Sequence, residues 1–226
     1  MCASYGLDPR FSDPDEILAD DEDLFDKLSA WALANDGSTL LPTGKNLRNV
    51  NPILMSRSGR LALEHAWWGY LIDGAPAKFP SINTRAERLR ERKEALPSRA
   101  LVPATRWFEL RKPQRTWYEF GGDHSLFAMA AVTRPGRTSD GTEYTCYSLV
   151  MRPATEELSE IHDRVPLLVP RSFAGDWLTS DLPSRELIEE AVAHSEFALR
   201  RVNARAIGER PTSRSAGDDA QGLKLF

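Results

Sequence analysis

Cysteine and histidine are scarce in this chain. Its 226 residues include two cysteines, Cys2 and Cys146, and four histidines. Two cysteines cannot build a disulfide framework, and such low usage is typical of a reducing compartment. The spacings CxxC, HxxxH and HExxH do not occur. We therefore expect no metal site and no cofactor.

Long apolar runs are missing as well. No segment approaches the length of a membrane span, and the first residues lack the basic-then-apolar pattern of a signal peptide. The sequence also has no Gly-rich phosphate loop and no GxSxG elbow, so nucleotide-cofactor and α/β-hydrolase functions have no support. We expect a cytoplasmic protein with no membrane partner.

The charge is distributed unevenly. The net charge is −4, but residues 12–26 contain eight acids and no base. The rest of the chain therefore has more bases than acids, and a basic groove on it is not excluded. Hydrophobic residues at 41% and charged residues at 27% are ordinary for a globular protein.

The pattern along the chain predicts many short strands with a few helices around them. Asp13 followed by Pro14 is typical of a helix start, and residues 38–51 and 73–82 are expected to be loops. Helices are predicted in 14–35, 84–95, 153–160 and 183–194, and strands at 52–57, 60–68, 99–102, 105–111, 115–120, 126–132, 143–151, 165–169 and 196–202. Turns are expected at Lys112–Pro113 and Pro135–Gly136. This order predicts an α+β fold around a mainly antiparallel, barrel-like sheet, with one domain over 1–206 and a flexible tail over 207–226.

Cys2 follows Met1 directly. Removal of Met1, by the cell's methionine aminopeptidase or by self-processing, would leave an α-amine and a thiol on one residue. Such a 1,2-aminothiol can condense with an aldehyde and close to a thiazolidine ring. The reference pKa values, about 8 for the amine and about 8.5 for the thiol, leave both groups partly reactive near neutral pH. The alternative is a disordered terminus that carries a cysteine by chance.

Four segments, in order along the chain, carry a resemblance to a known family. They are Met1-Cys2 with Tyr5; Asn49-Val50-Asn51-Pro52 with Trp68-Gly69; Ile82 to Glu87 with Arg99 to Ala104 and Trp107 to Leu110; and Ile161 to Pro166. Together they resemble the SRAP family (SOS response-associated peptidase) over roughly residues 1–205. The resemblance implies binding of abasic sites in single-stranded DNA through an N-terminal cysteine, by a monomer that is nucleoid-associated when bound to DNA.

The resemblance also implies a set of catalytic residues. Cys2 would be the nucleophile, Glu109 the proton shuttle, and His162 the acid that protonates the ring oxygen or the leaving thiolate. Asn83 would hydrogen-bond the sugar or hold the N-terminal residue. Each has a plainer alternative: Glu109 could be an exposed edge-strand residue, His162 a structural histidine, and Asn83 the N-cap of a helix that starts at Thr84.

Three further residues are candidates for DNA contacts. Arg85 and Arg164 suit bidentate hydrogen bonds to phosphates, and Trp68 could stack on the base beside the abasic gap. The sequence departs from the family's Met-Cys-Gly-Arg opening, because Ala3 and Ser4 follow Cys2. The missing arginine removes an expected phosphate contact, so we expect Ser4→Arg to strengthen binding.

A second departure is Asn51, which stands where a small apolar residue usually precedes Pro52. The function we expect is a covalent thiazolidine crosslink to abasic DNA. The alternatives are an N-terminal-nucleophile peptidase or amidohydrolase that uses Cys2, and a degenerate DNA-binding module without a covalent step.

Overall fold

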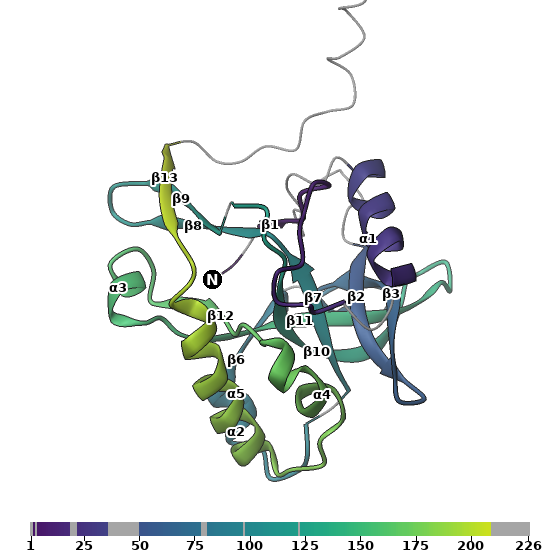
Figure 1. Cartoon of the computed structure of the whole chain (residues 1–226). Helices are drawn as coiled ribbons and strands as arrows, with labels where there is room; N and C mark the ends of the chain where they lie inside the picture. Colours follow the sequence, from purple (N-terminus) through teal and green to yellow (C-terminus); the bar gives the residue numbers. More distant parts are fainter. Residues whose placement is uncertain are drawn as a thin grey trace, which may run out of the picture.

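The computed structural model describes residues 2, 4–18, 22–35, 50–77, 81–96, 98–121 and 123–208 (Figure 1). Its helices are α1 (Glu22–Ala34), α2 (Ala86–Arg90), α3 (Glu156–Ser159), α4 (Arg171–Thr179) and α5 (Ser184–Leu199). Its strands are β1 (Tyr5–Gly6), β2 (Val50–Arg57), β3 (Arg60–Trp68), β4 (Leu71–Ile72), β5 (Ala75–Pro76), β6 (Asn83–Arg85), β7 (Arg99–Ala104), β8 (Arg106–Arg111), β9 (Thr116–Gly121), β10 (Phe127–Arg137), β11 (Glu143–Pro153), β12 (Arg164–Pro166) and β13 (Ala204–Gly208).

Five strands close into a barrel. They pair in the order β10, β7, β2, β3 and β11, and β11 pairs again with β10. The pairings are antiparallel except β3 with β11, where Cys146 lies opposite Trp67. β6 and β12 extend the sheet from β11. The predicted α+β fold with a mainly antiparallel, barrel-like sheet is confirmed.

Side-chain alternation divides the core in two. One face of the barrel strands forms a buried cluster that includes Ile53, Ala66, Trp68, Val102, Met129, Tyr147 and Leu149, and Cys2 and Tyr5 belong to it. The other face carries residues such as Leu54, Leu101 and Val150, which are covered by α1, α2, α4 and α5. Alternate residues of a strand point to opposite faces, so each barrel strand contributes to both clusters.

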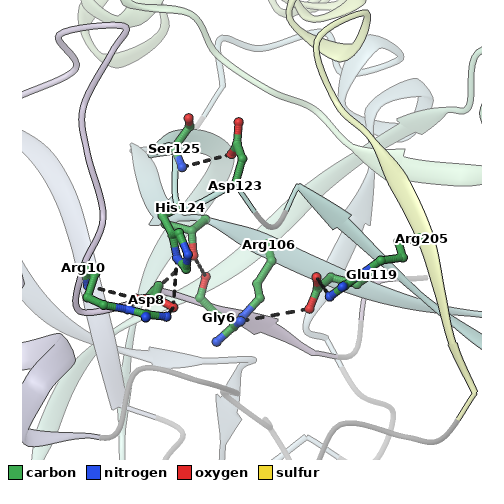
Figure 2. A network of polar contacts seen from close by, with 10 residues as sticks. Gly6, Asp8, Arg10, Arg106, Glu119, Asp123, His124, Ser125 and Arg205 are labelled. Atoms are coloured by element: carbon green, nitrogen blue, oxygen red, sulfur yellow. Dashed lines mark hydrogen bonds and ion pairs between the residues drawn. The ribbon is translucent and has the colours of Figure 1, made fainter.

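A second sheet, in the order β1, β8, β9, β13, carries the N-terminal residues. Tyr5 of β1 lies opposite Trp107 of β8, whose ring stacks on Phe120 with centroids 4.9 Å apart. Figure 2 shows the polar contacts that join these strands on the other face of β8, where Arg106 lies 4.0 Å from Glu119. Glu119 also accepts a hydrogen bond from Arg205 of β13 at 2.9 Å.

A comparable set of contacts holds the chain after β1. Asp8 accepts hydrogen bonds from the backbone and side chain of Arg10 and lies 3.1 Å from Nδ1 of His124 (Figure 2). Burial is the largest single influence on Asp8 and raises its pKa. The hydrogen bonds from Arg10 and the charges of His124 and Arg10 together outweigh burial and lower the pKa from 3.8 to about 2. These interactions attach the chain after β1 to the segment that follows β9.

Several sequence predictions need correction. Asp13 accepts hydrogen bonds from Ile17 and Leu18, but it caps a turn, and α1 begins only at Glu22. Pro135 and Gly136 do not form a turn. They lie inside β10, because the pairing of β10 with β11 continues as far as Arg137 opposite Glu143. The helix predicted over 84–95 is limited to α2, and the strand predicted over 196–202 is wrong, because α5 continues to Leu199.

Some predictions fall outside the described residues. Most of the loop expected over 38–51 lies there, although residues 50 and 51 begin β2. The expected tail also lies there from residue 209, whereas 207 and 208 continue β13. Among the described residues, no helix is both long enough and apolar enough to cross a membrane.

Candidate active site

Cys2 is completely buried, at 0% exposure. Its thiol donates a weak hydrogen bond to the carbonyl of Ser4 at 3.4 Å. Burial raises the pKa of this thiol far above its usual value, and the negative charge of Glu109 raises it further. The sulfur is therefore held as a neutral thiol in the unreacted protein, and a proton acceptor is required before it can attack.

Glu109 is a carboxyl that lies near enough to Cys2 to raise the pKa of the thiol. It projects from β8 on the same face as Trp107, and its side chain is 4% exposed. Burial raises the pKa of this carboxyl to about 7, and the positive charge of the chain's amino terminus opposes the rise. A carboxyl with this pKa both accepts and donates a proton near neutral pH, which is the property that general acid–base catalysis requires.

His162 approaches Glu109 from the other side of the site. It lies between α3 and β12, and its Nε2 is 3.8 Å from Oε2 of Glu109. Its Nδ1 accepts a hydrogen bond from the backbone N–H of Arg164 at 3.1 Å. Burial and the positive amino terminus lower the pKa of His162, while Asp163, whose Oδ1 is 3.0 Å from Nδ1, opposes the shift. The ring is therefore neutral at pH 7, with its proton on Nε2 toward Glu109.

Asn83 holds the N-terminal residue. Its Nδ2 donates a 2.7 Å hydrogen bond to the carbonyl oxygen of Cys2, and β6 fixes it because Asn83 pairs with Leu149 of β11. It is not a helix cap: α2 begins at Ala86, and Arg85 occupies the N-cap position without a side-chain cap bond. The Oδ1 atom of Asn83 is buried and has no hydrogen-bond partner among the described residues. This oxygen is available to accept a bond from a ligand.

The structure thus brings Cys2, Asn83, Glu109 and His162 together from four separate parts of the chain. This geometry contradicts the plainer alternatives for two of them, because Glu109 is not an exposed edge residue and Asn83 is not a cap. The arrangement combines a buried thiol, an amide that fixes its backbone, and a carboxyl–imidazole pair. It can move protons at groups attached to Cys2.

Trp68 does not fit the predicted role of stacking on a base. It is 1% exposed, its Nε1 donates to the carbonyl of Ile82 at 2.9 Å, and its ring packs on Tyr5 and Tyr147 inside the barrel. The preceding residue, Trp67, points to the outer face of β3, where it is partly exposed and packs on Tyr144 at 5.6 Å.

The two candidate phosphate ligands differ from each other. Arg85 is exposed at the end of β6, beside the Asn83 that holds Cys2. Arg164 has a side chain only 17% exposed, and its Nη1 lies 2.5 Å from Oε1 of Glu87 on α2. Arg85 can reach a phosphate without rearrangement, whereas Arg164 is already ion-paired.

The surroundings of Ser4 do not support the predicted effect of Ser4→Arg. It is 1% exposed, and its carbonyl accepts a hydrogen bond from the backbone of Phe108 at 3.0 Å. An arginine could not be placed there without displacing the packing around it. We therefore correct the expectation for Ser4→Arg: because Ser4 is buried, we expect this substitution to destabilise the N-terminal segment and not to strengthen DNA binding.

Sequence reasoning missed two groups near the site, Tyr118 and Lys112. Tyr118 lies directly opposite Glu109 on β9, and its hydroxyl is 3.5 Å from Nη1 of Arg111. Lys112 is near enough to His162 to contribute to its lowered pKa. Arg111 was not missed, because the alternation along β8 predicts that Trp107, Glu109 and Arg111 share one face of the strand. Among the described residues, no group of three or more potential ligands could hold a metal ion.

Comparisons with known proteins identify the family and several relatives of this chain. The family model described as SOS response associated peptidase (SRAP) matches residues 18–208, a range that contains Asn83, Glu109 and His162 but not Cys2. The chain is 29% identical over 184 residues to the abasic site processing protein YedK of Escherichia coli, covering 77% of this chain and 78% of that one. It is 26% identical over 193 residues to the abasic site processing protein YoqW of Bacillus subtilis, covering 79% and 80%.

Solved structures show the same fold. A protein from Bordetella bronchiseptica matches with a TM-score of 0.58 at 14% identity, covering 92% of this chain and all of that one. A phage-related protein from the same organism matches with a TM-score of 0.55 at 23% identity, covering 73% and 81%. The likeness therefore extends over most of the described chain.

Proposed function

This chain belongs to the SOS response associated peptidase (SRAP) family, and on that premise we propose that it binds abasic sites in single-stranded DNA and crosslinks to them through Cys2. The abasic site processing proteins YedK and YoqW support the abasic substrate. The observation that carries the covalent step is the contact of Asn83 with the Cys2 carbonyl, beside Glu109 with its pKa of about 7.

The reaction begins after hydrolysis of the Met1–Cys2 bond, by an aminopeptidase or by the protein itself. The α-amine of Cys2 attacks the aldehyde carbon of the ring-opened sugar and gives a carbinolamine, which loses water to form an imine. The thiol sulfur then bonds to the imine carbon, and its proton ends on the nitrogen. The product is a thiazolidine, and one water is released.

The buried side chains have separate tasks in this sequence. Glu109 gives a proton to the departing hydroxyl and takes one from the thiol, whose raised pKa makes an acceptor necessary. Asn83 keeps the Cys2 backbone in place and offers its Oδ1 to a sugar hydroxyl. When the ring reopens, the protonated form of His162, which is more acidic because its pKa is lowered, gives a proton to the leaving atom and becomes the neutral ring. Because the protein itself is the reactant, catalysis here means proton transfer and orientation at Cys2.

A denaturing gel tests the proposal. Mature protein is incubated with a single-stranded oligonucleotide that carries one abasic site, and we expect a retained band for the wild type and none for Cys2→Ala. Borohydride should recover some adduct from Cys2→Ala, since its amine still forms an imine. The matched control is Cys146→Ser, which changes the other buried cysteine and should crosslink normally.

Other outcomes identify the alternatives. Amide hydrolysis by Cys2 without DNA binding would indicate the N-terminal-nucleophile hydrolase, and binding without a retained band would indicate a non-covalent module. Intact-mass measurement gives a further check, because a protein that retains Met1 and still crosslinks fully would exclude the thiazolidine.

A further inference from the structure

Three polar side chains cross the interior of the barrel. Asn51 of β2, at 0% exposure, donates from Nδ2 to the hydroxyl of Tyr147 on β11 at 3.0 Å. The hydroxyl of Tyr147 is 2.7 Å from the hydroxyl of Tyr5 on β1, and both tyrosines are at most 1% exposed. We call this series of side chains the Asn51–Tyr147–Tyr5 line.

The line occupies an otherwise apolar space. Its neighbours in the buried cluster include Ile53, Ala66, Val102, Met129 and Leu149. A buried amide or hydroxyl is costly unless it is hydrogen-bonded, and each of these three side chains has a hydrogen-bond partner within the line. Asn51 is also the residue that stands where the family usually has a small apolar one.

The line ends on the strand that leads to Cys2. β1 has only two residues, Tyr5 and Gly6, paired with β8, and chain termini fray unless they are tied down. Tyr5 is three residues from Cys2, about 10 Å of extended chain. A slip of one residue in a strand would turn its side chains to the opposite face. A bond to the Tyr5 side chain therefore fixes the register of Cys2 as well.

Two tethers then hold the N-terminal residues along one strand. Tyr5 is bound to Tyr147 of β11, and Cys2 is bound to Asn83, which pairs with Leu149 of the same strand. Trp68 stiffens the first tether, because Tyr5 packs on its ring at 4.8 Å and Tyr147 stacks parallel to it at 6.2 Å.

We propose that the Asn51–Tyr147–Tyr5 line is a positioning device that fixes the register of β1 and so places the Cys2 amine and thiol against Glu109. The inference rests on the proposed function of Cys2. The three residues act through Cys2 and do not touch the substrate. The line acts on the rate of crosslinking and leaves the non-covalent binding of DNA unchanged.

The test uses Tyr5→Phe, which keeps the ring and removes the end of the line, and Tyr147→Phe, which removes its centre. Tyr144→Phe is the matched control, because Tyr144 is on the same strand but packs on Trp67 outside the barrel. With excess abasic oligonucleotide, we expect the crosslinking rate constant of Tyr5→Phe to fall by about tenfold to a hundredfold. The final yield, and the DNA affinity in a Cys2→Ala background, should match the wild type.

A purely structural role would give a different result. It would lower the yield, through a smaller folded fraction, and leave the rate constant unchanged; that result, or a wild-type rate for Tyr5→Phe, would overturn the proposal. Hydrogen exchange of residues 4–6 is a readout that needs no DNA, and it should accelerate in Tyr5→Phe but not in Tyr144→Phe. If the wild type formed no crosslink, the proposed function would fail, and exchange alone would decide whether the line holds β1.

Discussion

At the scale of single residues, the raised pKa of Glu109 has a cost to stability. Its folded pKa of about 7 exceeds its ordinary value of 4.5, because burial penalises the charged form. The folded state therefore binds the proton more tightly, and stability falls as the pH rises from 4.5 to 7. Glu109→Gln removes this penalty, so we expect it to stabilise the protein at pH 8 by about 3 kcal/mol at most, and hardly at all at pH 4. Thermal melting at both pH values measures the difference; an equal effect at both would contradict the raised pKa.

The same substitution should damage the chemistry. Glutamine keeps the size of glutamate but cannot carry the proton, so we expect crosslinking by Glu109→Gln to slow by about 10²–10⁴-fold. The wild-type rate should change with pH around 7 as the carboxyl titrates. A time course on denaturing gels at several pH values provides the measurement. Activity that is unaffected in Glu109→Gln would remove Glu109 from the mechanism.

His162 should affect a different step. Its Nε2 faces Glu109, and its lowered pKa makes the ring mainly neutral near pH 7 and its protonated form a stronger acid. We expect His162→Ala to slow reversal of the crosslink more than its formation, because reopening the ring requires a proton at the leaving atom. The crosslink is formed with one oligonucleotide, an excess of another length is added, and exchange is followed. Equal exchange rates in wild type and variant would leave His162 with a structural role.

At the scale of elements, β6 matters because it carries Asn83 to the Cys2 carbonyl. Asn83→Ala leaves that buried carbonyl without its donor, which should cost about 1–3 kcal/mol of stability. We also expect slower crosslinking, since the backbone of Cys2 is no longer fixed. Thr84→Ala, whose hydroxyl bonds Ser148 on β11, is a control that disturbs the same strand without reaching Cys2. Similar crosslinking rates in the two variants would contradict a specific role for Asn83.

The elements also show what the sequence could predict. Strong alternation and turn residues located most barrel strands and β8, and alternation placed Glu109 with Arg111. The alternation pattern could not show which of the neighbours Trp67 and Trp68 faces the interior, because both are large and aromatic. The side that each one faces is set by the way the barrel closes. α4 was missed because Gly175 interrupts its helical pattern, although Phe173 and Trp177 have helical spacing and are buried. The strand predicted over 196–202 does not form, because α5 continues to Leu199 and buries its own residues Ser195 and Leu199.

The contacts between distant segments were beyond sequence reasoning. Residue type and position alone favoured the plainer alternatives for Cys2, Glu109 and His162, and only the family resemblance grouped them as catalytic residues. The Asn51–Tyr147–Tyr5 line and the Glu87–Arg164 ion pair depend on tertiary packing, since no local pattern joins residues that are 77 or more positions apart. Asn51 was noticed only as a departure from the family pattern.

At the scale of the whole molecule, DNA binding should depend on salt through arginines near the site. Neutralising a phosphate releases counterions, so each lost contact on single-stranded DNA lowers the slope of log affinity against log salt by about 0.7. We expect this change for Arg85→Ala, because Arg85 is exposed beside Asn83. Fluorescence anisotropy in a Cys2→Ala background, over a range of salt, measures it without crosslinking. Arg185→Ala, exposed on the first turn of α5, is the control.

Changing Glu87, the ion-pair partner of Arg164, should strengthen DNA binding, whereas loss of Arg85 should weaken it. Glu87 holds its guanidinium at 2.5 Å, and a DNA phosphate must compete with that carboxylate for it. Glu87→Gln weakens the competitor and removes a negative charge, so we expect tighter DNA binding and a steeper salt slope. Arg164→Ala should weaken binding more than Arg85→Ala, because it removes a cation and also leaves Glu87 unpaired near the DNA. In the Arg164→Ala background, Glu87→Gln should restore only the share of the lost DNA affinity that comes from the unpaired Glu87 carboxylate. An unchanged DNA affinity and salt slope in Glu87→Gln would contradict phosphate binding by Arg164. The ion pair of Arg164 with Glu87 would then serve only to hold α2 to β12.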